Sequence, residues 1–131
     1  MKKLLKEQKI SPRERSQLMR EFIKFCAKEL NLQKPTNCKI KFTMDKNETE
    51  TYAHFDPSDN KIVVYIKERG MADSGRSLCH ELKHLRQRQQ NQLKPNSGET
   101  GSDEENLANA VAGIIMRKFG KIRPEIYRFS S

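Results

Sequence analysis

The sequence predicts a single α+β domain in which helices flank a small sheet. Near both ends of the chain, apolar residues recur every three or four positions, which is typical of amphipathic helices. Between residues 38 and 67 the spacing changes to two, as expected of half-buried strands. A chain of 131 residues has the usual size of one domain with a modest core.

The first predicted helix begins at Ser11, so residues 1–10 are expected to be a basic, flexible lead-in and residues 11–131 the single domain. A capping Ser, a Pro at the first helical position and Glu14 three residues after the Ser form a capping box. The helix is expected to end near Asn31. An apolar stripe follows its length, with Cys26 as a small core residue: Leu18, Met19, Phe22, Phe25, Cys26 and Leu30.

Three strands are expected, at residues 39–44, 52–55 and 61–66. Residues 56–60 are dense in turn formers and predict a hairpin between the last two strands. The apolar run at 62–66 indicates a strand covered on both faces. We therefore expect a small three-stranded, mainly antiparallel sheet after the N-terminal helix.

Two more helices are expected after the sheet. The first follows a loop at 70–75 and runs from about 74 to 91, with Asp73 or Ser74 as its cap. The second begins at Ser102 or Asp103 and ends at Phe119, with Gly120 as a natural C-terminal cap. The apolar tail at 122–129 is expected to pack back on the domain.

The string His80-Glu81-Leu82-Lys83-His84 is the most informative motif in the chain. On a helix, residues four apart lie on the same face, so both imidazoles can reach one metal ion. Glu81 lies about 100° round the helix, where it can address a metal-bound water without ligating the metal. The alternative is a solvated helix face that carries these residues by accident.

A catalytic zinc site needs a third protein ligand, and Glu105 is the preferred candidate. His54, in a predicted strand, is the other possible ligand. Asp103 and Glu104 are interpreted as acids that complement the helix dipole.

The position of Glu105 within a strip of small residues favours it. Ala108, Asn109 and Ala112 follow it at helical spacing. The two alanines would let this helix approach the first closely, and Asn109 would sit where it can orient a histidine ring.

The pattern resembles the thermolysin-type gluzincins in their minimal form. This resemblance implies a zincin-like fold. The matching residues are His80, Glu81, His84, Glu105, Ala108, Asn109 and Ala112. Residues 25–127 more closely resemble small uncharacterised metallopeptidase-like proteins of tailed phages, chiefly through residues 60–66, 80–87 and 98–103. Many minimal gluzincins have a second acid two residues after the first, where this chain has Leu107.

The resemblance implies a zinc metallopeptidase that hydrolyses a peptide or protein substrate. His80, His84 and Glu105 would bind one zinc ion, and Glu81 would be the general base for a zinc-activated water. His54, Tyr52 and Tyr127 are the candidate donors to the oxyanion. The strand at 52–55 is the candidate edge for pairing with an extended peptide.

Two other functions stay open. The first is a catalytically silent zinc-binding domain that acts as a structural or interaction module. The second is a basic nucleic-acid-associated phage protein with a vestigial motif. The net charge is +9, but the basic residues are spread along the chain and no common nucleic-acid-binding signature occurs. Only nonspecific contact with nucleic acid is therefore expected.

The composition indicates a reducing compartment. Cys26, Cys38 and Cys79 form no C-x-x-C pair and no disulfide framework. The N-terminus lacks the apolar run of a signal peptide, and no stretch reaches the ~20 apolar residues that span a bilayer. We expect a cytoplasmic protein, in the host cytoplasm if it is phage-encoded, with no membrane partner.

Overall fold

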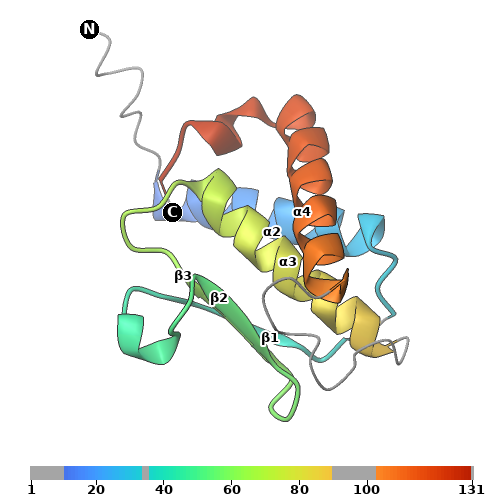
Figure 1. The fold of residues 1–131 in the computed structure, drawn as a ribbon. Helices are drawn as coiled ribbons and strands as arrows, with labels where there is room; N and C mark the ends of the chain where they lie inside the picture. The colour runs from blue at the N-terminus through green and yellow to red at the C-terminus, as the bar shows by residue number, and fades with distance from the viewer. Residues whose placement is uncertain (1–10, 34–35, 90–102, 131) are drawn as a thin grey trace, which may run out of the picture.

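The computed structural model describes residues 11–33, 36–89 and 103–130. Within these ranges the chain has three α-helices and a three-stranded mixed sheet, so the predicted α+β class is confirmed. One helix, α3, crosses the middle of the molecule, with the sheet on one side and α2 and α4 on the other (Figure 1). The predicted lead-in at 1–10 and the predicted end of the second helix near residue 91 lie outside the described residues.

Helix α2 (Pro12–Glu29) has the capping box that the sequence predicted. The Glu14 N–H donates to Ser11 Oγ (3.1 Å), and the Ser11 N–H donates to Glu14 Oε1 (3.2 Å). Beyond Leu30, the C-terminal cap, Asn31 adopts a φ of 55°, which ends the helix near the predicted residue. The predicted stripe faces the core, where Phe22 and Cys26 are fully buried.

The sheet contains β1 (Lys39–Thr43), β2 (Ala53–Asp56) and β3 (Lys61–Tyr65) in the order β1-β3-β2. The predicted hairpin of β2 and β3 is antiparallel, but β1 pairs with β3 in parallel, so the expectation of a mainly antiparallel sheet was wrong. β3 pairs with a strand on each side, and the chain from β1 reaches it only after η1 (Lys46–Glu48) and β2. This long connection allows β1 to run in the same direction as β3.

Helix α3 (Met71–Gln89) begins three residues before the predicted start, so the predicted caps Asp73 and Ser74 lie inside its first turn. The tail of the chain explains the earlier start. The Met71 N–H donates to the carbonyl oxygen of Phe129 (2.8 Å), which satisfies one of the free donors at the helix start. The segment at Phe129 and Ser130 accordingly lies beside the beginning of α3.

Helix α4 (Asp103–Ile122) continues past Phe119, so Gly120 is not the C-terminal cap that the sequence suggested. Gly120 instead permits close contact, because a Cβ there would lie 2.2 Å from Cε2 of Tyr127. Tyr127 belongs to the short helix η2 (Pro124–Tyr127), whose Ile126 is fully buried. The predicted packing of the tail on the domain is thus confirmed.

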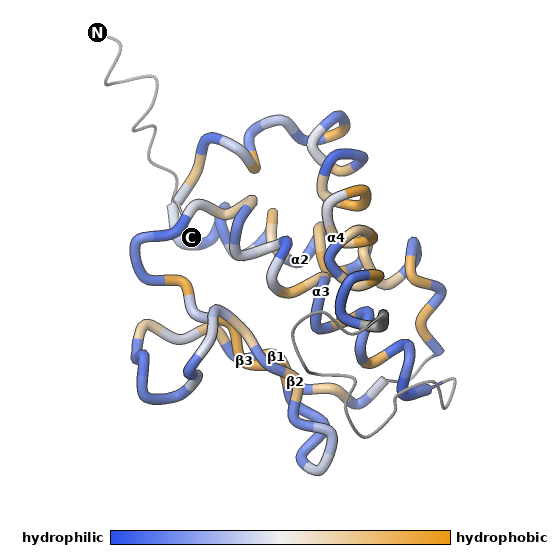
Figure 2. Tube along the Cα trace, in the orientation of Figure 1, coloured by the Kyte–Doolittle hydropathy of each residue, from blue (hydrophilic) through white to orange (hydrophobic). Residues whose placement is uncertain are grey.

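The core forms where α3 meets α2, α4 and the sheet. In Figure 2 the strands and the facing turns of the helices carry apolar residues, whereas the loops joining the strands are hydrophilic. None of the described helices combines the length and the apolar character needed to cross a membrane.

Candidate metal centre

Three potential metal ligands converge where the first turn of α4 meets the middle of α3. One ligand atom each from His80, His84 and Glu105 lies within 4.8 Å of the other two. His84 Nε2 is 3.2 Å from His80 Nε2 and 3.0 Å from Glu105 Oε2, and Glu105 Oε1 contacts His80 Nε2. The fold therefore brings the predicted ligands together, and this group could hold a metal ion.

The spacing of these atoms suits a small cation. Two atoms bound tetrahedrally at about 2.0–2.1 Å from one ion lie about 3.3 Å apart, close to the separations at His84. Burial lowers the pKa of His80, although the neighbouring Glu105 opposes this effect. The lowered pKa keeps His80 neutral at neutral pH, and only a neutral imidazole has a lone pair for a metal.

His84 is held in one orientation by a buried amide. Its Nδ1 lies 2.9 Å from Oε1 of Gln87, a side chain that is only 1% exposed. Since Oε1 can only accept, Nδ1 carries the proton, which leaves the lone pair of Nε2 for a metal ion shared with His80 and Glu105. Sequence reasoning missed Gln87. The available signal was an amide three residues after a ligand histidine, within reach on the same helix face.

His80 is oriented from α4. Its ring is hydrogen-bonded to Glu105 and to Asn109, the residue that the sequence suggested for this role. Ala108 and Ala112 are buried where α4 packs on α3, so small side chains do allow the close approach that a carboxylate ligand needs. Leu107 is 49% exposed and lies outside the contact.

Glu81 lies beside the three-residue group and is not part of it. Its side chain is buried, and its Oε2 is 4.0 Å from His80 Nε2. Burial, and then the charge of Glu105, raises the pKa of Glu81 to about 8, against a backbone hydrogen bond from Phe55. A carboxyl group with a pKa in this range can accept and release a proton near neutral pH.

The hydrogen bond from the Phe55 N–H to Glu81 shows which edge of the sheet faces the metal centre. Phe55 belongs to β2, which forms one edge of the sheet. This strand begins and ends one residue later than the predicted strand at 52–55. Because the Phe55 N–H reaches the Glu81 carboxylate, the free edge of β2 runs alongside the HExxH face of α3.

Two residues with candidate roles lie away from the centre. His54 Nδ1 contacts Thr49 Oγ1 (2.9 Å), and the side chain faces opposite to Phe55, which packs on the core. Tyr127 packs on Gly120, roughly 22 Å along α4 from Glu105 at 1.5 Å per residue. Neither residue joins the metal group.

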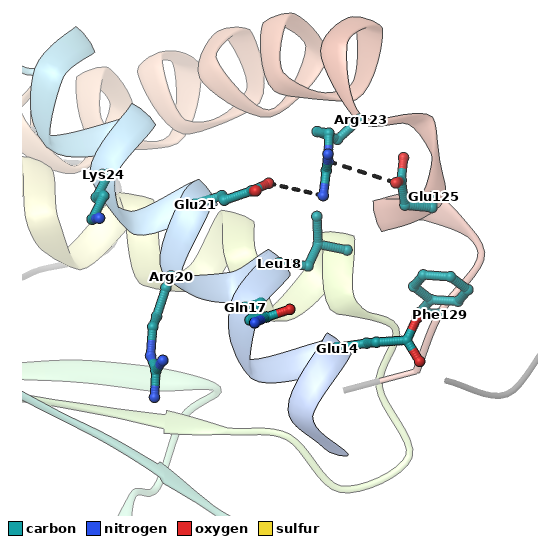
Figure 3. Close-up of a pocket in the computed structure, with 9 residues that line it drawn as sticks. All are labelled: Glu14, Gln17, Leu18, Arg20, Glu21, Lys24, Arg123, Glu125 and Phe129. Atoms are coloured by element: carbon teal, nitrogen blue, oxygen red, sulfur yellow. Dashed lines mark ion pairs between the residues drawn. The ribbon is translucent and has the colours of Figure 1, made fainter. Parts of the chain in front are cut away.

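A hollow of about 470 Å³ lies elsewhere, between α2 and the C-terminal segment. Figure 3 shows Arg123 in this hollow between two acids, with Glu21 at 3.0 Å and Glu125 at 3.6 Å. Its lining includes neither the metal group nor Glu81. We interpret it as a surface depression in which Arg123 is already paired with acids of the protein itself.

Comparison of the chain with protein families, with curated proteins and with solved structures finds no significant match in any of the three. The interpretation of the centre therefore rests on its own geometry.

Proposed function

We propose that the protein is a zinc metallopeptidase with a zincin-like fold. The observation that carries the proposal is the convergence of His80, His84 and Glu105 with Glu81 beside them. Two imidazoles and one carboxylate form a donor set that suits zinc and leaves a position open. The HExxH helix, a third ligand from the following helix and an adjacent edge strand also agree with the gluzincin resemblance of the sequence.

Such an ion supplies a water of lowered pKa and polarises the carbonyl of the bond to be cleaved. Glu81 takes the proton from the attacking water and passes it to the leaving amine. The Phe55 N–H holds the Glu81 carboxylate toward the metal group, and Gln87 and Asn109 hold the two histidines. The edge of β2 binds the extended peptide by backbone pairing.

A second candidate is a zinc-binding domain without catalysis. The burial of the ligands favours it, since the side chains of His80 and His84 are only 13% and 9% exposed. In that case zinc mainly joins α3 to α4 and stabilises a small core.

The Glu81→Gln variant separates these functions. We expect it to bind zinc as the wild type does and to cleave peptides about 100-fold more slowly or worse, because a general base contributes at least that factor. The measurement is mass-spectrometric cleavage of a peptide library, with and without chelator, beside a zinc titration. Glu50→Gln, at an exposed acid, is the matched control.

Equal cleavage by the wild type and Glu81→Gln would remove Glu81 from the chemistry. If zinc raises the melting temperature but no peptide is cleaved, the structural candidate is the correct one.

A further inference from the structure

Arg69 is held in a fixed orientation and is bonded to α3 at Ser77, one helical turn before His80 and Glu81. Its Nη1 donates to the carbonyl oxygen of Tyr65 (3.0 Å), and its Nη2 donates to Ser77 Oγ (3.0 Å). Ser77 precedes His80 by three residues and Glu81 by four, so the three share one face of α3. Four residues of helix span about 6 Å, so the point at which Arg69 is bonded to α3 lies about 6 Å along the helix axis from Glu81.

The same guanidinium stacks on an exposed aromatic ring at the start of the edge strand. Arg69 Cζ is 4.2 Å from the ring centroid of Tyr52, which is 59% exposed and directly precedes β2. Lys46 Nζ lies 5.1 Å from the same centroid and 4.7 Å from that of Tyr65. Two cations therefore gather at the end of β2 that lies nearest the first turns of α3.

These cations have no ionic partner within the ranges that the structure covers. The nearest acid to Arg69 on α3 is Asp73, but its carboxylate pairs with Arg76. The two cations contact the same ring and place positive charge at this end of β2, so a carboxylate beside the ring would be attracted by both. Three of the five N–H groups of Arg69 donate to Tyr65 O, Asp73 O and Ser77 Oγ, and the two that remain can donate to a carboxylate.

We propose that Arg69 and Tyr52, with Lys46, form a subsite for a carboxylate of the peptide substrate. This inference rests on the proposed peptidase function. An extended peptide rises about 3.3 Å per residue, so the separation of about 6 Å along α3 places the carboxylate about two residues from the cleaved bond. The carboxylate is an Asp or Glu side chain or a free C-terminus. The net charge of +9 favours the approach of acidic peptides.

The test compares matched peptides with zinc-loaded protein. Each pair carries Glu or Gln two residues to either side of the cleaved bond, and a further pair ends in a free acid or an amide. We expect kcat/KM to be about tenfold or more higher for the acidic member, as for one charge-assisted hydrogen bond. The free-acid pair distinguishes a C-terminal carboxylate from a side chain.

Arg69→Gln should abolish this preference, while Lys67→Gln, an exposed cation in the same loop, should keep it. Thermal melting checks folding, because Arg69 also joins the loop to α3. If Arg69→Gln is unfolded, Tyr52→Leu at the exposed ring replaces it, and a smaller preference is expected. A purely structural role would lower the melting temperature and leave the Glu:Gln ratio unchanged.

Binding to the zinc-loaded Glu81→Gln variant, measured by fluorescence anisotropy with the same peptides, separates the two proposals. Cleavage by the wild type without a charge preference overturns the subsite and leaves the peptidase standing. Acid-selective binding that depends on Arg69, without any cleavage by the wild type, overturns the peptidase and keeps the subsite as a peptide-binding site. The absence of both cleavage and binding overturns both.

Discussion

The lone pair that His84 offers to a metal depends on one buried amide. Gln87 Oε1 accepts a hydrogen bond from the Nδ1–H, which leaves Nε2 unprotonated on the side of His80 and Glu105, where a metal ion would bind. Without Gln87, the His84 ring could carry its proton on either nitrogen and could rotate. Part of the binding free energy of a metal would then be used to select one tautomer and one ring orientation.

Replacing Gln87 with Met tests this coupling. Met has a similar volume, so packing should persist, while the acceptor for Nδ1 is lost. We expect zinc affinity to fall roughly 10- to 100-fold, as is typical when a partner of a ligand histidine is removed. The measurement is a zinc titration in competition with a chelator.

Gln89→Met is the control, because the Gln89 amide is on the same helix but contacts the Gln33 backbone. Equal zinc affinities for folded Gln87→Met and the wild type would show that Gln87 does not orient the ligand.

The sequence revealed residues that follow local patterns and missed a partner that does not. His80 and His84 stand at i and i+4 on one helix, and Glu105 begins a strip of small residues, so spacing alone was sufficient to select them. Gln87 was missed because its role depends on burial, and sequence does not distinguish the buried Gln87 from the partly exposed Gln89 two residues later.

At the scale of elements, α3 is packed closely against two helices at Gly75. A Cβ at this position would lie 2.6 Å from Cε of Met116 on α4 and 3.2 Å from Cε2 of Phe22 on α2. Both neighbours are fully buried, so neither can move freely into solvent. Gly75 therefore sets how closely the HExxH helix approaches its partners.

Gly75→Ala should destabilise the protein by up to about 2 kcal/mol. The higher helix propensity of Ala contributes up to ~1 kcal/mol, but overpacking a buried contact costs about 1–3 kcal/mol, so the loss prevails. The free energy of unfolding in urea measures the effect.

Gly113→Ala on α4 is the matched control. A Cβ there meets only Nη1 of Arg117, at an ordinary 3.5 Å, so this change should stabilise the protein slightly. A stabilising effect at Gly75 equal to that at Gly113 would contradict the close packing.

Features that depend on residues close together in the sequence were predicted correctly. The errors in helix ends and strand order come from contacts between residues that are not neighbours in the sequence. The capping box at Ser11 was predicted because its partners lie within four residues of each other. The start of α3 was misplaced because the acceptor for Met71 is Phe129, near the other end of the chain. Gly120 was assigned as a cap because the ring of Tyr127 that covers it cannot be seen from the helix sequence. Strand order was missed since pairing of β1 with β3 is likewise non-local.

For the whole molecule, the metal centre would join α3 to α4 at the end opposite to the tail. Glu105 lies in the first turn of α4, whereas η2 packs near the last turn of that helix. Zinc that binds the folded chain alone adds its binding free energy to the stability of the fold. Activity and stability would then depend on the same three side chains.

Zinc-edge X-ray absorption spectroscopy of the zinc-loaded protein tests this central claim most directly. The structure predicts one ion per chain with nitrogen and oxygen ligands at about 2.0–2.1 Å, including two imidazoles. Glu105→Ala should lose one oxygen ligand and keep both imidazoles, because His80 and His84 remain on α3. A sulfur ligand at about 2.3 Å, or a spectrum that Glu105→Ala and His84→Ala leave unchanged, would contradict the assignment.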